Sequence, residues 1–190
     1  RLQLWQAEAG LLGGQLAAEP ARLDLARPPQ RLAVQVRGLE LAELLRVYPA
    51  EGLSGRGTLD GRLPLRLDAE GLHIVEGRIA ARAPGGALQL RSERIRAFAR
   101  SNPALQLAAT ALEDFRYDRL ESEVDYAPRG QLLLALRLHG QNPALEGGRP
   151  VNLAINLEEN VPSLLTSLQL SGRVNEAIQR RVQQQLQRRD

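Results

Sequence analysis

Two histidines, His73 and His139, are the only imidazoles in the chain. Imidazole is the side chain best suited to general acid–base work near neutral pH, and it is a common metal ligand. Each histidine lies in a segment whose alternating apolar and polar residues predict a strand, and neither has a serine or a carboxylate pair at catalytic spacing. We interpret both as strand-surface or partly buried residues. Cysteine is absent and the acidic residues are dispersed, so the sequence offers no metal site.

The glycine-rich run GLSGRGTLDG at 52–61 invites comparison with phosphate-binding loops. It lacks the Lys-Ser/Thr ending of such a loop and opens no helix. Its glycines are expected to serve a turn and a strand where two backbones approach closely. Ser54 and Ser171 each lie beside a glycine, but neither has the flanking glycines of a nucleophile elbow. We therefore expect no catalytic residues, no cofactor and no enzymatic activity.

The charged residues do not indicate a nucleic-acid partner. All 25 basic residues are arginine, which is typical of a GC-rich genome and raises the pI to about 10.1, yet the net charge is only +3. Aromatic residues make up 3% of the chain, and no basic stripe alternates with rings on which bases stack. The lack of cysteine suits an oxidising compartment in which the domain needs no disulfides.

The clearest elements are two strands, at 130–139 and 151–158, each with an apolar residue at every second position. The segment between them, GQNPALEGGRP, is rich in the residues that form turns. The two strands are therefore expected to be adjacent and antiparallel. Their apolar faces consist of Leu132, Leu134, Leu136, Leu138, Val151, Leu153, Ile155 and Leu157.

Upstream, further alternating segments recur about every ten residues between turns, which predicts an antiparallel meander. In 72–82, the pattern places Val75, Ile79 and Ala81 on one face. Short fragments at 115–117 and 123–126 predict two more strands. Helical spacing is confined to four segments, 39–48, 102–113, 160–169 and the C-terminal 173–190.

These elements predict a mainly β fold with a few short helices. We expect one antiparallel β-domain over 1–172, with three of the helices inserted in it, followed by an amphipathic C-terminal helix over 173–190. The long aliphatic face of the sheet allows two interpretations. In the first, the helices cover it as an ordinary core; in the second, part of it remains open as a groove for alkyl chains. The helices are few and short for so many strands, which favours some opening.

Several ordered motifs in 115–172 resemble the C-terminal signature of YdbH-like proteins, members of the AsmA-like group of bacterial envelope proteins. The upstream run GRGTLDGRLPLRL at 55–67 also fits this type of domain. The matching pieces are Phe115-Arg116-Tyr117-Asp118, Asp125-Tyr126, Gly140-Gln141-Asn142-Pro143, Gly148-Arg149-Pro150-Val151-Asn152-Leu153, and Glu159-Asn160-Val161-Pro162 followed by Leu164-Leu165.

The resemblance implies a curved, taco-shaped antiparallel sheet that crosses the periplasm and carries phospholipids in a hydrophobic groove. It further implies an inner-membrane anchor upstream of this chain, which we interpret as a fragment of a longer protein. A small outer-membrane lipoprotein, YnbE-like, is expected to add strands at the C-terminal end of the sheet. The localisation implied is periplasmic, and the ligands are phospholipid acyl chains.

On this basis, one set of residues is expected to line the groove. An alternative is that helix 161–168 and the last helix cap the groove, which would leave a closed β-domain that docks a partner lipoprotein without binding lipid. The predicted lining comprises Val34, Val36, Leu59, Leu63, Leu65, Leu132, Leu134, Leu136, Leu138, Val151, Leu153, Ile155 and Leu157.

Overall fold

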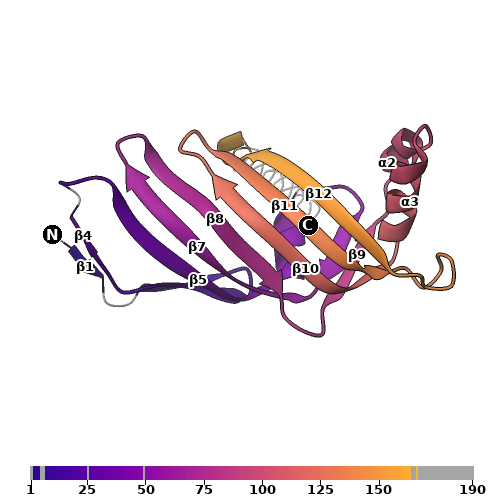
Figure 1. Ribbon diagram of the computed structural model, residues 1–190, viewed down its shortest axis with the longest axis horizontal. Coiled ribbons are helices and arrows are strands. Elements are labelled where there is room, and N and C mark those ends of the chain that lie inside the picture. The colour runs from indigo at the N-terminus through magenta and orange to yellow at the C-terminus, as the bar shows by residue number, and fades with distance from the viewer. Residues whose placement is uncertain (1, 5–6, 25, 49, 164–165, 167–190) are drawn as a thin grey trace, which may run out of the picture.

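The computed structural model describes residues 2–4, 7–24, 26–48, 50–163 and 166 (Figure 1). Most of the predicted helix 160–169 and all of the predicted helix 173–190 lie outside these residues, although 161–163 and 166 are helical. The helices are α1 (Leu41–Val47), α2 (Glu93–Ala99) and α3 (Pro103–Leu112). The strands are β1 (Leu2–Leu4), β2 (Ala7–Leu11), β3 (Gly14–Ala18), β4 (Ala21–Leu23), β5 (Gln30–Glu40), β6 (Leu53–Arg56), β7 (Thr58–Asp68), β8 (Gly71–Ala81), β9 (Gly86–Leu90), β10 (Phe115–Tyr126), β11 (Gln131–Gln141) and β12 (Val151–Asn160).

Most strands belong to one antiparallel sheet of ten strands. Its main path runs β12-β11-β10-β8-β7-β5-β3-β2, and β9 joins β6 to the first residues of β10. Strands β1 and β4 form a separate antiparallel pair. The predicted mainly β, antiparallel fold is therefore confirmed. The helices, however, are not mainly C-terminal as expected, because α1, α2 and α3 interrupt the chain between strands.

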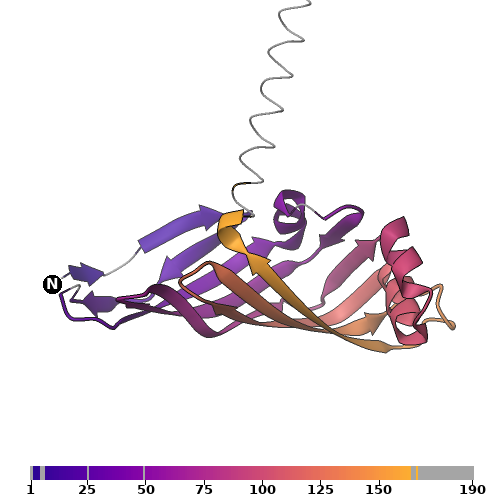
Figure 2. The same cartoon turned by 90° about the horizontal axis from the view of Figure 1, so that it is seen from above.

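The sheet curls so that α1 lies on its inner side (Figure 2). The Tyr48 hydroxyl, directly after α1, donates a hydrogen bond to the Glu159 carboxylate on β12. Helix α1 follows β5, which is separated from β12 by four strands. In a flat sheet β5 and β12 would lie roughly 24 Å apart, so this contact requires strong curvature. The result is a half-barrel with an inner and an outer face.

Bulges in three strands account for much of the curl, because each bulge bends its strand and increases its twist. In β5 the register shifts between Val36 and Leu39, where Gly38 has a positive φ of 66°. In β8 the register with β7 shifts between Ile74 and Arg78, and Glu76 in this stretch has a positive φ of 56°. In β10 the register with β11 shifts between Tyr117 and Arg119.

Two sequence predictions were wrong because of these bulges. The fragments 115–117 and 123–126 are parts of one strand, β10, whose bulge moves the inward-facing side chains from odd to even positions. In β8 it is Ile74, opposite Tyr126, that shares the face of Ile79. Val75 instead borders a hollow with Arg31 and Arg62 on the outer face.

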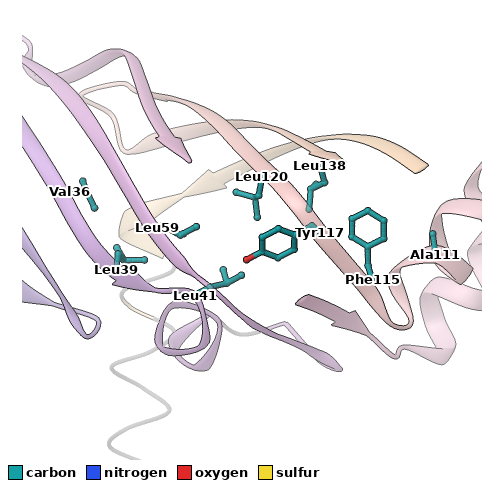
Figure 3. Packing of buried hydrophobic residues seen from close by; sticks show 9 residues of the cluster. All are labelled: Val36, Leu39, Leu41, Leu59, Ala111, Phe115, Tyr117, Leu120 and Leu138. Carbon is teal, nitrogen blue, oxygen red and sulfur yellow. The ribbon is translucent and has the colours of Figure 1, made fainter. Parts of the chain in front are cut away.

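The buried core runs along the inner face of the sheet, from Leu41 on α1 to Ala111 on α3 (Figure 3). Phe115 is fully buried, and the Tyr117 hydroxyl donates to the Arg56 carbonyl at 2.9 Å. A Cβ at Gly52 would lie 2.1 Å from the Arg91 carbonyl oxygen, and one at Gly61 would lie 2.3 Å from the Arg78 carbonyl oxygen. The glycine-rich run 52–61 therefore serves close backbone approach, as predicted. The cluster consists of Val36, Leu39, Leu41, Leu59, Ala111, Phe115, Tyr117, Leu120 and Leu138.

Helices α2 and α3 form a hairpin that projects from one end of the sheet (Figures 1 and 2). The sequence did not predict α2, which spans only seven residues. Helix α3 lies within the predicted range 102–113, and the Asn102 side chain caps it by accepting from the N–H of Ala104 at 3.0 Å. No helix in the described part of the chain is long and apolar enough to cross a membrane.

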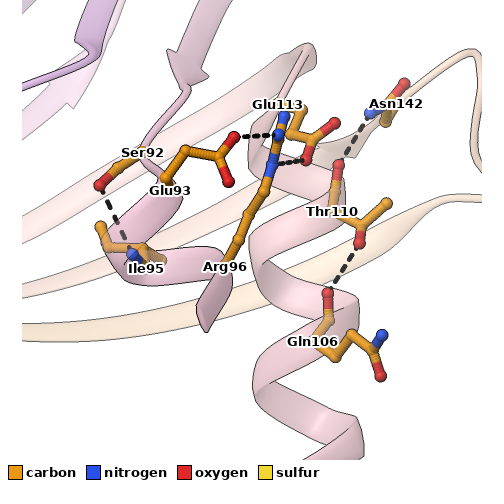
Figure 4. A network of polar contacts seen from close by, with 8 residues as sticks. All are labelled: Ser92, Glu93, Ile95, Arg96, Gln106, Thr110, Glu113 and Asn142. Carbon is orange, nitrogen blue, oxygen red and sulfur yellow. Dashed lines mark hydrogen bonds and ion pairs between the residues drawn. The ribbon is translucent and has the colours of Figure 1, made fainter. Parts of the chain in front are cut away.

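Polar contacts hold the base of this hairpin (Figure 4). Arg96 on α2 bridges Glu93 at 2.7 Å and Glu113, just after α3, at 2.8 Å. The buried Asn142 amide, in the loop after β11, donates to the Thr110 carbonyl at 3.0 Å. The last turn of α3 is therefore attached to the sheet, while the tip of the hairpin extends beyond it.

Candidate functional site: the inner face of the sheet

The strand register places the predicted lining residues of β11 and β12 on one face. Residues directly opposite each other in an antiparallel pair point to the same side of the sheet. Leu134 lies opposite Leu157, Leu136 opposite Ile155, and Leu138 opposite Leu153. Leu132 and Val151 continue the same alternation, opposite Glu159 and Gly140 respectively.

The same face continues across the middle of the sheet to β7 and β5. Leu136 lies opposite Ser122 of β10, and Ser122 lies opposite Ile79 of β8. Ile79 is opposite Gly61 of β7, which in turn is opposite Val36 of β5. Alternation along β7 and β5 then adds Leu59, Leu63, Leu65 and Val34. The structure thus brings all the predicted lining residues onto the inner face.

The inner face is covered to different extents along its length. Val36, Leu59 and Leu138 are 2%, 4% and 3% exposed, because they belong to the buried core, to which α1 contributes Leu41. Leu157 is 37% exposed, and the other predicted lining residues are half-buried. Helix α1 therefore covers part of the aliphatic surface and leaves the remainder accessible from the inner side, within the part of the chain that the structure describes.

Sequence reasoning missed several residues of this face. Leu39 and Leu120 lie just beyond the bulges of β5 and β10, where the change of parity breaks the pattern of alternate residues. Ile79 and Val124 had strand signals but were not assigned to the lining. Assigning Ile79 and Val124 to the inner face requires the register of β8 and β10 with their neighbouring strands, because residues opposite each other share a face. The sequence alone does not give this register.

Polar groups on the inner face are few and hydrogen-bonded. Ser122 is 8% exposed, and its hydroxyl donates to the Glu123 carbonyl at 3.2 Å. The hydrogen bond to Glu159, with burial, raises the pKa of Tyr48 from 10.0 to about 12. This surface therefore presents mainly hydrocarbon, which binds alkyl groups without directional contacts.

The outer face of the same strands carries ion pairs. Arg62 binds both carboxylate oxygens of Glu19, at 2.8 and 2.9 Å, and this contact, with a hydrogen bond from Gln35, lowers the pKa of Glu19 from 4.5 to about 2. Arg82 binds Asp60 at 2.7 and 2.8 Å and holds its pKa below the ordinary value. Charged residues make up half of the lining of two hollows on this face, which is typical of a surface that faces water.

Both histidines also lie among acidic side chains. His139 Nδ1 is 2.6 Å from an Asp118 oxygen, and His73 Nε2 is 3.0 Å from an Asp68 oxygen. Asp68, Glu70 and His73 bring potential ligand atoms within 4.8 Å of one another in the β7–β8 turn. Asp68 already accepts from the Glu70 N–H at 2.9 Å, so these contacts also serve to shape the turn.

The last strand, β12, forms an edge of the sheet. Among the described residues it pairs with β11 alone, over ten residues and with no register shift. Natural sheets usually protect long edge strands with charged side chains, prolines or bulges; β12 contains no proline or bulge, and its two charged residues, Glu158 and Glu159, are confined to its C-terminal end. Its outward N–H and C=O groups therefore form a template on which another strand can pair.

A family model described as "YdbH-like: Intermembrane phospholipid transport protein YdbH" matches residues 1–183. The matched range contains the short motifs on which the sequence resemblance was based, and that resemblance is thereby confirmed. No curated protein and no solved structure gives a significant match to the chain.

Proposed function

Because this chain belongs to the YdbH-like family of intermembrane phospholipid transport proteins, we propose that its inner face is a groove that conducts phospholipid acyl chains. The observation that carries the proposal is the continuous aliphatic surface from β12 to β5, of which only part is covered by α1. The proposed lining is the partly exposed members of the thirteen residues that the sequence predicted, together with Ile79, whereas Val36, Leu59 and Leu138 form part of the buried core beneath it.

The energetics suit the transfer of acyl chains. Each methylene removed from water contributes about 0.8 kcal/mol, and the contribution is not directional. An aliphatic surface without unsatisfied polar groups therefore holds a chain while allowing it to slide. Buried side-chain polar atoms without a partner are absent from the described residues, so no fixed polar contact on this surface favours one position along the groove.

The test compares two adjacent leucines of β11. Leu134 is half-buried on the inner face, whereas Leu133 is 44% exposed on the outer face. Purified protein is examined by native mass spectrometry, and lipids are extracted from the same sample. Leu134→Asp is expected to abolish co-purifying phospholipid, because it places a charge in the groove. Leu133→Asp is expected to leave lipid occupancy unchanged.

Circular dichroism melts establish that both variants are folded before occupancy is compared. A wild-type protein without phospholipid, or equal lipid occupancy in the two variants, would contradict the groove. Either result would favour the alternative of a β-domain that docks a partner without carrying lipid.

We further infer that a small outer-membrane lipoprotein, YnbE-like, extends the sheet by pairing with β12. The long unprotected edge supports this inference, since strand addition uses main-chain hydrogen bonds and needs no specific pocket. In this arrangement the chain is the periplasmic C-terminal part of a bridge between the two membranes, and the parent protein is anchored in the inner membrane upstream.

Lysines introduced on the edge strand test this docking. Asn152→Lys with Asn156→Lys places two charges on the outer side of β12, where Lys discourages edge pairing. Co-purification with the lipoprotein is expected to be lost. The matched control is Ala9→Lys on β2, at the opposite edge of the sheet, which is expected to retain the partner. Equal retention by both variants would exclude β12 as the docking edge.

A further inference from the structure

The α2–α3 hairpin exposes large apolar side chains that the proposed groove does not use, with Phe98 and Leu105 nearest to its tip. Phe98 is 74% exposed, Ile95 40%, Leu105 41% and Leu107 46%. From 93 to 107 every residue except the buried Ala99 is exposed. Most of the buried contacts of the hairpin lie at its base, where Ala111 is fully buried in the core.

Cationic side chains accompany these apolar residues. From Arg91 to Asp114 the hairpin with its entry and exit carries four arginines (Arg91, Arg94, Arg96 and Arg100) and three carboxylates (Glu93, Glu113 and Asp114). All three carboxylates lie at the base, where Arg96 is engaged with Glu93 and Glu113. Among the described residues, Arg94 and Arg100 are exposed and have no ion-pair partner, and Arg100 lies at the turn between the two helices.

We propose that the tip of this hairpin inserts into the headgroup region of an anionic phospholipid bilayer. An aromatic ring and leucines flanked by arginines suit that interface, because the rings and alkyl groups enter the acyl boundary while the guanidinium groups remain with the phosphates. The position of the hairpin at one end of the sheet leaves the tip free to approach a surface (Figures 1 and 2).

The size of the patch favours a bilayer over a protein partner. A stable protein interface takes roughly 20–30 residues from each side, whereas the exposed part of the hairpin, all of 93–107 except Ala99, offers 14 residues. A membrane surface needs no such area, since a few inserted side chains and each nearby arginine add to the attraction. The excess of arginine over carboxylate matches the negative charge of an anionic leaflet.

Vesicle sedimentation of the full chain tests the proposal. Vesicles of phosphatidylethanolamine with phosphatidylglycerol are compared with vesicles of phosphatidylcholine alone. Binding is expected to the anionic vesicles and to weaken with added salt, because salt screens the arginines. Absence of binding to the anionic vesicles would overturn the proposal.

Two variants separate the apolar and cationic contributions. Phe98→Ser with Leu105→Ser is expected to weaken binding about tenfold, since a partly inserted ring contributes on the order of its burial energy. Arg94→Glu with Arg100→Glu is expected to weaken binding by at least about fivefold per arginine.

Matched controls carry the same chemical changes on the outer face of the sheet. These are Val75→Ser with Leu133→Ser, and Arg31→Glu with Arg78→Glu, all at exposed positions. Both controls are expected to bind vesicles like the wild type. Equal weakening in a hairpin variant and its control would overturn the proposal, because it would reflect overall charge or hydrophobicity.

A fluorescent reporter gives a readout of insertion that does not depend on overall affinity. Phe98→Trp, in a Trp5→Phe background, is expected to show a blue-shifted emission and quenching by lipids brominated on their acyl chains. Unchanged emission with bound vesicles would exclude insertion. The groove variant Leu134→Asp is expected to bind vesicles normally, so failure of the groove and failure of the hairpin contact are distinguishable.

Discussion

The inner and outer faces of the sheet are built from the same strands, yet their chemistry is opposite. Along β11, Leu134, Leu136 and Leu138 point inward, whereas Leu133 and Arg137 point outward. The inner side gains its stability from the removal of hydrocarbon from water, while the outer side carries ion pairs that contribute little because water screens them. The residues that stabilise the fold and the residues proposed to bind lipid therefore lie on the same face. Substitutions on the inner face are expected to change both stability and lipid binding.

The largest effect on the free energy of unfolding is expected for a fully buried residue of the core on the inner face. Phe115→Ala removes a fully buried ring and is expected to lower the free energy of unfolding by about 3–5 kcal/mol. The matched control is Phe98→Ala, at the 74% exposed tip of the hairpin, with an expected effect within about 0.5 kcal/mol. Urea denaturation measures both, and similar values would contradict the assignment of Phe115 to the core.

A second comparison uses one strand. Leu138→Ala, at a position 3% exposed, is expected to cost about 2–5 kcal/mol because it leaves a cavity in the buried core. Leu133→Ala, 44% exposed on the outer face, is expected to cost less than about 1 kcal/mol. Urea denaturation again gives both values. A larger loss for Leu133→Ala would mean that the register of β11 is shifted by one residue.

A smaller effect on the free energy of unfolding is expected at the contact between Tyr48, directly after α1, and Glu159 on β12. Tyr48→Phe removes the hydrogen bond to Glu159 and is expected to cost about 1 kcal/mol. The pKa of Tyr48 is raised from 10.0 to about 12 in the folded protein, so the unfolded chain loses this proton first. Its contribution to stability is therefore complete below pH 10.0 and is lost as the pH rises to about 12.

Denaturation at alkaline pH checks this expectation. The difference in unfolding free energy between wild type and Tyr48→Phe should shrink over that interval. A constant difference would show that the hydrogen bond does not form in solution.

The smallest effect is expected on the outer face, at the ion pair of Glu19 with Arg62. The pKa of Glu19 is lowered from 4.5 to about 2, so the pair contributes above pH 4.5 and its contribution is lost as the pH falls toward 2. Glu19→Gln is expected to lower stability at neutral pH only slightly, because both side chains are partly exposed and water screens the pair, and this difference from the wild type is expected to shrink as the pH falls. Thermal melts from about pH 5 to about pH 3 compare the two proteins, and identical acid profiles would contradict the pairing.

Alternation in the sequence was sufficient to predict the β fold and the inward leucines of β11 and β12. It failed where local geometry depends on the neighbouring strand. The bulge between Tyr117 and Arg119 changes which residues of β10 point inward, and the sequence pattern alone shows only two disconnected fragments. Helix α2 was missed because seven residues rich in arginine give little periodic signal.

The contact from Tyr48 to Glu159 was also beyond prediction. It joins residues 111 positions apart, and its formation depends on the curl of the complete sheet. The extent to which α1 covers the inner face follows from the same curl. Sequence reasoning therefore left open whether the aliphatic face is core or groove, and in the structure some residues of this face are buried while others are partly exposed.

The order of strands in the sheet has a consequence for how the chain folds. From β5 to β12 the path follows the order of the chain, with only β6 and β9 set aside from it. Each new strand of the path therefore pairs with the one before it in the path; the connections β7–β8, β10–β11 and β11–β12 are short, whereas 17 residues separate β5 from β7 and 33 separate β8 from β10. A chain that is synthesised from its N-terminus can extend this sheet strand by strand, and β12 is the edge at which that extension ends.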